Sequence, residues 1–305
     1  MPINRKDIQQ YSNLELLSKQ VVEGFITGLH KSPFHGFSVE FSEYRPYNPG
    51  ENTKYIDWRL YGKTDKLFIK RFEEETNLRC QIVIDQSASM HFPFDAPENK
   101  LSFSVRAAAA LAYMLKKQRD AVGLTLFSDQ IDLHLPAKSS TIHQSLLFNQ
   151  LEKTIEPKAK PTQTGTSAAK VLHEIAEIVH KRSLVVIFSD MFEQNSTSAE
   201  LFQAIQHLKH NKHEVILFHT IDHQHELEFD YENRPYRFID LETGEQIKLQ
   251  PNEIKESYQK QIKEVVSEIK LQCLQYKIDF VEADISKGYH QILHPYLVKR
   301  GKMSR

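Results

Sequence analysis

Three oxygen-bearing side chains follow a short apolar segment in the first third of the chain. Asp85, Ser87 and Ser89 occupy every second position of the loop that begins where Gln81–Asp85 (QIVID) ends. A turning backbone could direct all three oxygens toward one point. Capping of a strand end or of a helix is the simpler role for these residue types, because Asp and Ser favour both positions.

Two more oxygen donors occur at comparable positions later in the chain. Thr166 follows Gly165 at the start of a predicted helix, and Asp190 stands at the end of the predicted strand Ser183–Ser189 (SLVVIFS). Hydroxyl and carboxylate oxygens are the ligands that hard divalent cations such as Mg²⁺ and Mn²⁺ prefer, in octahedral coordination. The five residues therefore predict a metal site, provided that the fold brings them together.

The segments between these residues predict how the fold would do so. Apolar, β-branched runs alternate with amphipathic helical stretches from residue 78 to the end of the chain, which is typical of a doubly wound, mostly parallel α/β sheet with helices on both faces. In such sheets ligands bind beyond the carboxyl ends of the strands. The short turn Ser128–Gln130 predicts one exception, because it can only return the chain as an antiparallel edge strand.

Two regions depart from this alternation. Residues 226–249 read as two strands around turns, a β-hairpin insert. Residues 1–77 contain a helix near 13–27 and then a turn-rich stretch with aromatic and charged residues, including Trp58. We expect two parts, an amino-terminal accessory segment (1–77) packed on an α/β domain (78–305).

Composition excludes several classes of function. The chain has 305 residues and a net charge of −1, which argues against binding nucleic acid by bulk charge. The longest apolar run, 107–115, is too short to span a bilayer, and the polar amino terminus lacks a signal peptide. Cys80 and Cys273 form no CxxC motif, so a cytoplasmic protein without disulfides or membrane insertion is expected.

Taken together, these residues resemble a known family. The pattern DxSxS after an apolar strand, a Thr further on and an Asp at a strand end resemble the metal-ion-dependent adhesion site of von Willebrand factor A domains. Further stretches resemble the bacterial domain of unknown function 58 family, whose motifs surround a von Willebrand factor A-like domain. One residue departs from the family pattern: Glu51 stands where Asp is expected after the glycine. The stretches are 36–41 (GFSVEF), 44–47 (YRPY), Pro49-Gly50, 56–58 (IDW), 71–78 (RFEEETNL), 226–229 (ELEF) and 238–244 (FIDLETG).

The resemblance implies a function based on binding. It implies a cytoplasmic, non-enzymatic module for metal-dependent protein–protein interaction, often encoded beside a MoxR-type AAA+ ATPase. Ser87, Ser89 and Thr166 would supply neutral hydroxyl ligands, and Asp85 and Asp190 would supply carboxylates directly or through water. Such a cation could accept an Asp or Glu carboxylate from the partner.

Two other functions remain open at this stage. A metal-dependent phosphoester hydrolase could use the same Asp and Ser residues, although Ser87 stands where a phosphatase with an aspartyl nucleophile has its acidic proton donor. A metal-free scaffold would use the loop only for capping. His207, His210 and His213 recur at intervals of three, but without nearby Cys or a compact Glu partner they are weak candidates for a transition metal.

Overall fold

The computed structural model describes residues 13–30, 44–47, 58–70, 78–94, 96–156, 168–191, 198–239 and 245–303. They fall into two compact units. Residues up to Ile26 join those from Leu78 onward in the larger unit, and residues between Thr27 and Asn77 form the smaller one. The expected accessory segment is thus divided between the two units.

The smaller unit contains a short antiparallel strand pair and one helix. Strands β1 (Tyr44–Pro46) and β2 (Phe68–Lys70) pair with each other, and helix α3 (Trp58–Thr64) lies between them in the sequence. The backbone N–H of Tyr47 donates to the carbonyl of Leu67 at 2.9 Å, which extends the pairing by one step.

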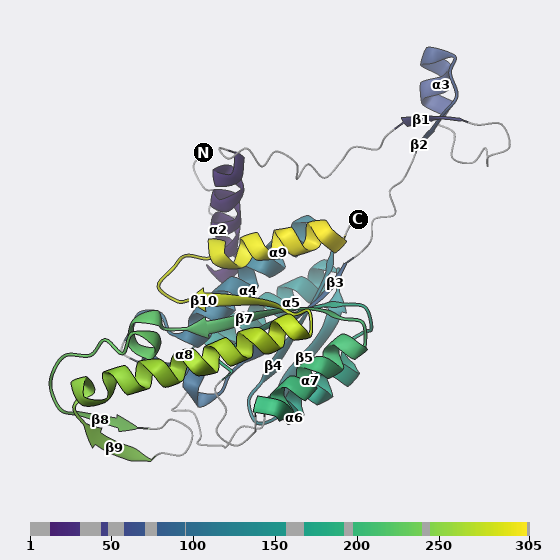
Figure 1. The fold of residues 1–305 in the computed structure, drawn as a ribbon. Helices are drawn as coiled ribbons and strands as arrows, with labels where there is room; N and C mark the ends of the chain where they lie inside the picture. The colour runs from purple at the N-terminus through teal and green to yellow at the C-terminus, as the bar shows by residue number, and fades with distance from the viewer. Residues whose placement is uncertain are drawn as a thin grey trace, which may run out of the picture. The chain divides into compact units, whose positions relative to one another are not determined.

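The larger unit is built on a six-stranded, mostly parallel sheet (Figure 1). Its strand order is β10-β7-β6-β3-β4-β5, and only β5 runs antiparallel to its neighbour. The mixed α/β class, with one antiparallel edge strand, is confirmed. The strands are β3 (Arg79–Asp85), β4 (Ala121–Phe127), β5 (Ile131–Lys138), β6 (Leu184–Ser189), β7 (Glu214–Ile221) and β10 (Asp279–Asp284).

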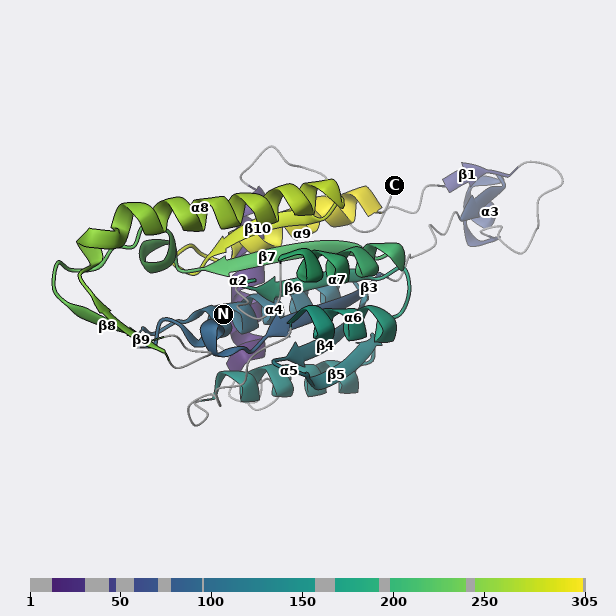
Figure 2. The same cartoon turned by 60° about the horizontal axis from the view of Figure 1, so that its bottom comes forward.

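Helices cover both faces of this sheet (Figure 2). One face packs Val83, Ile187 and Leu217 against α6, α7 and α8 in a single apolar cluster. On the other face α4 contacts β3, β4 and β7, α5 contacts β4 and β5, and α9 contacts α4 and β10. The helices are α4 (Lys100–Lys117), α5 (Thr141–Ile155), α6 (Ala168–Ile178), α7 (Ser198–His210), α8 (Pro251–Gln275) and α9 (His290–Met303).

The amino-terminal helix α2 (Asn13–His30) contacts α4 and α5. Leu14 and Val22 are buried, and Glu15 forms an ion pair with Lys116 of α4 at 2.7 Å. The backbone N–H of Leu14 donates to Glu152 of α5 at 3.4 Å. This helix therefore contributes to the core of the larger unit.

The expected hairpin insert follows β7. A one-turn π-helix, η3 (His223–Leu227), leads into the antiparallel pair β8 (Tyr236–Ile239) and β9 (Gln246–Leu249), after which α8 returns to the sheet. No helix in the part of the chain that the structure describes is long and apolar enough to cross a bilayer.

The order of the strands determines where a ligand could bind. The chain passes from β3 to β4 and β5 on one side, and then adds β6, β7 and β10 on the other side of β3. The direction of winding reverses between β3 and β6. In open α/β sheets this reversal opens a crevice beyond the carboxyl ends of the two strands.

Candidate functional site

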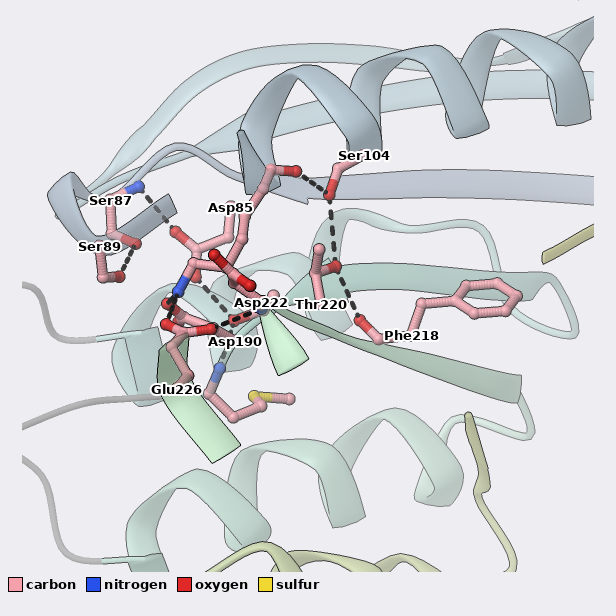
Figure 3. Close-up of polar contacts among 12 residues, drawn as sticks. Asp85, Ser87, Ser89, Ser104, Asp190, Phe218, Thr220, Asp222 and Glu226 are labelled. Atoms are coloured by element: carbon pink, nitrogen blue, oxygen red, sulfur yellow. Dashed lines mark hydrogen bonds and ion pairs between the residues drawn. The ribbon is translucent and has the colours of Figure 1, made fainter. Parts of the chain in front are cut away.

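Two of the predicted acidic residues lie at this reversal point. Asp85 is the last residue of β3, and Asp190 directly follows β6, the parallel neighbour of β3. Ile84 is paired in register with Phe188, so the two strands end at the same level. The sheet therefore places both carboxylates at one edge, as Figure 3 shows.

Asp85 is held by hydrogen bonds from both strands. Its Oδ1 accepts from the backbone N–H of Ser87 at 2.8 Å, and its Oδ2 accepts from the hydroxyl of Ser189 at 2.7 Å. The Ser189 hydroxyl in turn accepts from the N–H of Met191 at 3.0 Å. With 3% of its surface exposed, Asp85 is fixed in a buried position.

The Ser87 and Ser89 hydroxyls lie side by side. Ser87 precedes the short helix η2 (Ala88–His91), and the turn of this helix brings the two Oγ atoms to 3.0 Å from each other (Figure 3). Neighbouring ligands in an octahedral shell of radius about 2.1 Å are roughly 3 Å apart. The two hydroxyls are hydrogen-bonded to each other, and their 3.0 Å separation also matches that of two ligands of one Mg²⁺ ion.

Ionisation of Asp85 is unfavourable in the folded chain. Burial, and secondly the charge of the neighbouring Asp190, raise the pKa of Asp85 to about 6, although the hydrogen bonds from Ser189 and Ser87 oppose the shift. A bound cation would remove this penalty because it would neutralise the carboxylate.

A buried ammonium group contacts the second carboxylate. Lys100 Nζ lies 2.7 Å from Asp190 Oδ2, and both side chains are 1% exposed. Lys100 is the first residue of α4, where the helix dipole disfavours a cation. Burial alone would lower the pKa of Lys100, but the charges of Asp190 and Glu226 raise it above the usual value, so the side chain is cationic.

Glu226 brings the insert into the site. Its Oε1 lies 2.5 Å from Lys100 Nζ, and its Oε2 accepts from the backbone N–H of Asp222 at 2.7 Å. Glu226 belongs to η3, which follows β7, and Asp190 follows β6. The Lys100 ammonium therefore links the segments that follow these two strands. Burial raises the pKa of Glu226, while the charge of Lys100 opposes the shift.

An aromatic cluster anchors the insert beside these residues. Phe92, just after η2, packs edge-on against His225 with ring centroids 5.9 Å apart, and His225 contacts Tyr231 at 5.2 Å. Beyond Tyr231 the rings of Phe229, Tyr236, Phe238 and Tyr258 continue the cluster onto β8 and α8. Ring contacts of His225 before Glu226 and of Phe229 after it therefore hold this segment in place.

The balance of charge in the site is negative. Asp85, Asp190 and Glu226 contribute three carboxylates, and Lys100 contributes one ammonium group, which leaves two negative charges. His219 adds no compensating charge, because burial lowers its pKa to about 4. Asp222 is hydrogen-bonded to His225, at 2.6 Å. A divalent cation would neutralise the remaining charge.

The donor set fits a hard cation better than a transition metal. Within the described ranges no group of three or more His, Cys, Asp or Glu residues is arranged to hold a metal ion, and this applies to the histidines of α7 and equally to Asp85, Asp190 and Glu226. The candidate site relies instead on serine hydroxyls together with carboxylates, which suits Mg²⁺ or Mn²⁺.

Four of the five predicted residues gather at one edge of the sheet: Asp85, Ser87, Ser89 and Asp190. Thr166 lies outside the described residues. Sequence reasoning missed Lys100 and Ser189, and it noted Glu226 only as part of a family motif. A lysine at the first position of a helix was the available signal for Lys100, because the helix dipole makes that position unfavourable for a cation.

The fold and this edge define a mixed α/β protein with a hydroxyl and carboxylate site at the reversal point of its sheet. The family model described as "Protein of unknown function DUF58" matches residues 43–267. The chain belongs to the DUF58 family.

Named relatives are uncharacterised proteins. Uncharacterized protein Rv1480 of Mycobacterium tuberculosis and uncharacterized protein Mb1516 of Mycobacterium bovis are each 26% identical over 177 residues. The match covers 58% of this chain and 55% of each relative. The chain thus spans about half the length of the relatives that it matches.

Similar solved structures share little sequence with this chain. The hypothetical protein BatB from Bacteroides thetaiotaomicron has a TM-score of 0.44 and 17% identity, and the match covers 74% of this chain and 99% of that one. An aerotolerance-related membrane protein from Bacteroides fragilis has a TM-score of 0.44 and 15% identity, with 73% and 97% covered.

Proposed function

We propose that the larger unit is a von Willebrand factor A-like module that binds a protein partner through a divalent cation. The cation, Mg²⁺ or Mn²⁺, would be held by Asp85, Ser87, Ser89, Thr166 and Asp190 in the manner of a metal-ion-dependent adhesion site. The observation that carries this proposal is the 3.0 Å Ser87–Ser89 hydroxyl pair beside a buried carboxylate.

The chain's own residues would prepare the site for the cation. Ser189 and the Ser87 N–H orient Asp85, and Lys100 orients Asp190. When bound, the cation supplies a positive centre that can take an oxygen ligand from outside the protein. Because Ser87, Ser89 and Thr166 are neutral, an Asp or Glu carboxylate of the partner is the ligand that this centre favours.

The family resemblance suggests what the partner is. It extends the proposal to a MoxR-type AAA+ ATPase, with this chain acting as a non-enzymatic cytoplasmic adaptor. The net charge of −1 supports a protein partner over nucleic acid. Membrane insertion is not part of the proposal.

A metal-free scaffold is the second candidate, and one observation favours it. Both oxygens of Asp85 already accept hydrogen bonds, from Ser87 and Ser189, so the loop is capped without a cation. In that case Mg²⁺ would change neither the melting temperature nor partner binding.

A capture experiment with purified components separates these functions. The full chain and its Asp85→Asn variant are each mixed with the MoxR-type ATPase of the same genome, in Mg²⁺ and in EDTA. We expect capture by the wild type in Mg²⁺ only, and none by the variant. Capture that survives both EDTA and Asp85→Asn supports the scaffold and contradicts the metal-dependent proposal.

The same samples test for hydrolysis. Turnover of p-nitrophenyl phosphate that requires Mg²⁺ and is lost in Asp85→Asn would assign the site to a phosphoester hydrolase. We expect no turnover above that of the protein-free buffer.

A further inference from the structure

Lys100 and Glu226 lie beside the proposed metal site but are not among its predicted ligands. Lys100 comes from the first turn of α4, Asp190 from the end of β6 and Glu226 from η3, and the ammonium contacts both carboxylates at 2.7 and 2.5 Å. Lys100 is 1% exposed and Glu226 15% exposed, so solvent screens these charges weakly.

Burying an ammonium group at a helix start costs folding free energy unless carboxylates compensate its charge. A lysine at a helix start faces the positive end of the helix dipole. Two carboxylates around a single ammonium supply more negative charge than one lysine requires. The surplus remains at the edge of the sheet where Asp85 and the two serine hydroxyls lie.

We propose that Lys100 is a tethered counter-ion and that Glu226 is a positioning residue, and that together they set how tightly the site holds its divalent cation. The inference rests on the proposed metal-dependent function. Lys100 lowers the negative charge to two, so the cation-bound site is close to neutral and can accept a carboxylate from a partner. Without Lys100 the cation would be held more tightly, and the bound site would repel that carboxylate.

Glu226 has the opposite effect on the cation. It contributes one of the three carboxylates, and through Oε1 it holds Lys100 in contact with Asp190. Because Glu226 sits in η3 at the start of the insert, its charge belongs to a segment that is separate from the predicted ligands. Neutralising Glu226 would leave one negative charge and a weaker cation site.

Isothermal titration of Mg²⁺ into the full chain at pH 7.5 tests these opposite effects. Lys100→Met keeps the length of the side chain and removes its charge, and Glu226→Gln keeps the shape and removes the charge. We expect Lys100→Met to bind Mg²⁺ roughly tenfold more tightly than the wild type, and Glu226→Gln roughly tenfold more weakly.

Arg106→Met is the matched control. Arg106 lies on the same helix and pairs with Glu98 at 2.6 Å, away from Asp190, so Mg²⁺ affinity should be unchanged. A purely structural role for Lys100 predicts weaker binding in every variant that loosens the site, and it does not predict tighter binding in any of them.

The outcomes separate the inference from the function on which it rests. If the wild type binds no Mg²⁺, the proposed function fails. If the wild type binds Mg²⁺ but Lys100→Met and Glu226→Gln shift the affinity in the same direction or leave it unchanged, only the charge-setting inference fails. Should Lys100→Met fail to fold, Lys100→Gln replaces it: tighter Mg²⁺ binding than in Arg106→Met supports the inference, and equal or weaker binding overturns it.

Discussion

The Ser189 hydroxyl donates a hydrogen bond to the Asp85 carboxylate across two neighbouring strands, at 2.7 Å. Both residues are buried, and each ends its strand. The bond joins the ends of β3 and β6 at the point where the winding of the sheet reverses. It fixes the carboxylate on which the proposed metal site depends.

Removal of this hydrogen bond should weaken the metal-free protein. In Ser189→Ala the Asp85 carboxylate loses a buried donor and the Met191 N–H loses its acceptor. We expect a loss of about 2 kcal/mol in the free energy of unfolding, measured by urea denaturation in EDTA. Ser257→Ala is the control, because this exposed serine bonds only to a carbonyl of its own helix and should change stability by less than about 0.5 kcal/mol.

The stability of the metal-free chain should depend on the ionisation of Asp85. Its pKa lies at 3.8 ordinarily and at about 6 in the fold, so the folded state holds the proton more tightly than the unfolded state does. The stabilisation is therefore fully present below pH 4 and is lost as the pH rises through about 6. We expect a decrease of about 2 kcal/mol between these limits in EDTA.

Asp85→Asn isolates this contribution, because it removes the titrating group. Denaturation curves of the variant between pH 4 and pH 7.5 should lack the part of the decrease that Asp85 causes. Identical pH profiles for the two proteins would show that the carboxylate is not held in the buried, proton-retaining environment that we describe.

A glycine in β4 should be essential for the sheet beneath the site. A Cβ at Gly123 would lie 2.1 Å from Gln81 Oε1 and 2.6 Å from the carbonyl oxygen of Leu135. Gln81 crosses this position to donate to Thr125 and to Leu135 at 2.9 and 3.2 Å. Gly123→Ala should therefore destabilise the protein by about 3 kcal/mol in a thermal or urea melt.

Gly24 offers the comparison for that substitution. It lies inside helix α2, and a Cβ added there meets no atom within 4 Å. Gly24→Ala should raise stability by about 0.5–1 kcal/mol, because alanine favours the helix. Equal effects of the two substitutions would contradict the close approach at Gly123.

Much of the fold could be predicted from local patterns. The β-branched run Gln81–Asp85 predicts a buried parallel strand, and the three-residue turn Ser128–Gln130 predicts an antiparallel edge strand; both are present. The amino-terminal helix was predicted as well. Its packing on the α/β domain was expected too, but particular contacts such as Glu15–Lys116 were not, because they join residues far apart in the sequence.

The site was predictable at two strand ends and in the loop that follows β3. Asp85 and Asp190 could be placed at one edge because parallel strands end together, and Ser87 and Ser89 follow Asp85 closely. Lys100 and Glu226 are 126 positions apart, and no local spacing relates them. Their contact arises from the way α4 and the segment after β7 converge on the end of β6.

Anomalous diffraction from crystals soaked in Mn²⁺ would test the central claim most directly. We predict one anomalous peak within about 2.2 Å of the Ser87 and Ser89 Oγ atoms, with Asp85 and Asp190 as direct or water-mediated ligands and Lys100 still in contact with Asp190. The peak should be absent from crystals of Asp85→Asn. Crystals that show no peak at these serines, or a peak at the histidines of α7 instead, would contradict a metal-dependent docking site at the end of β3.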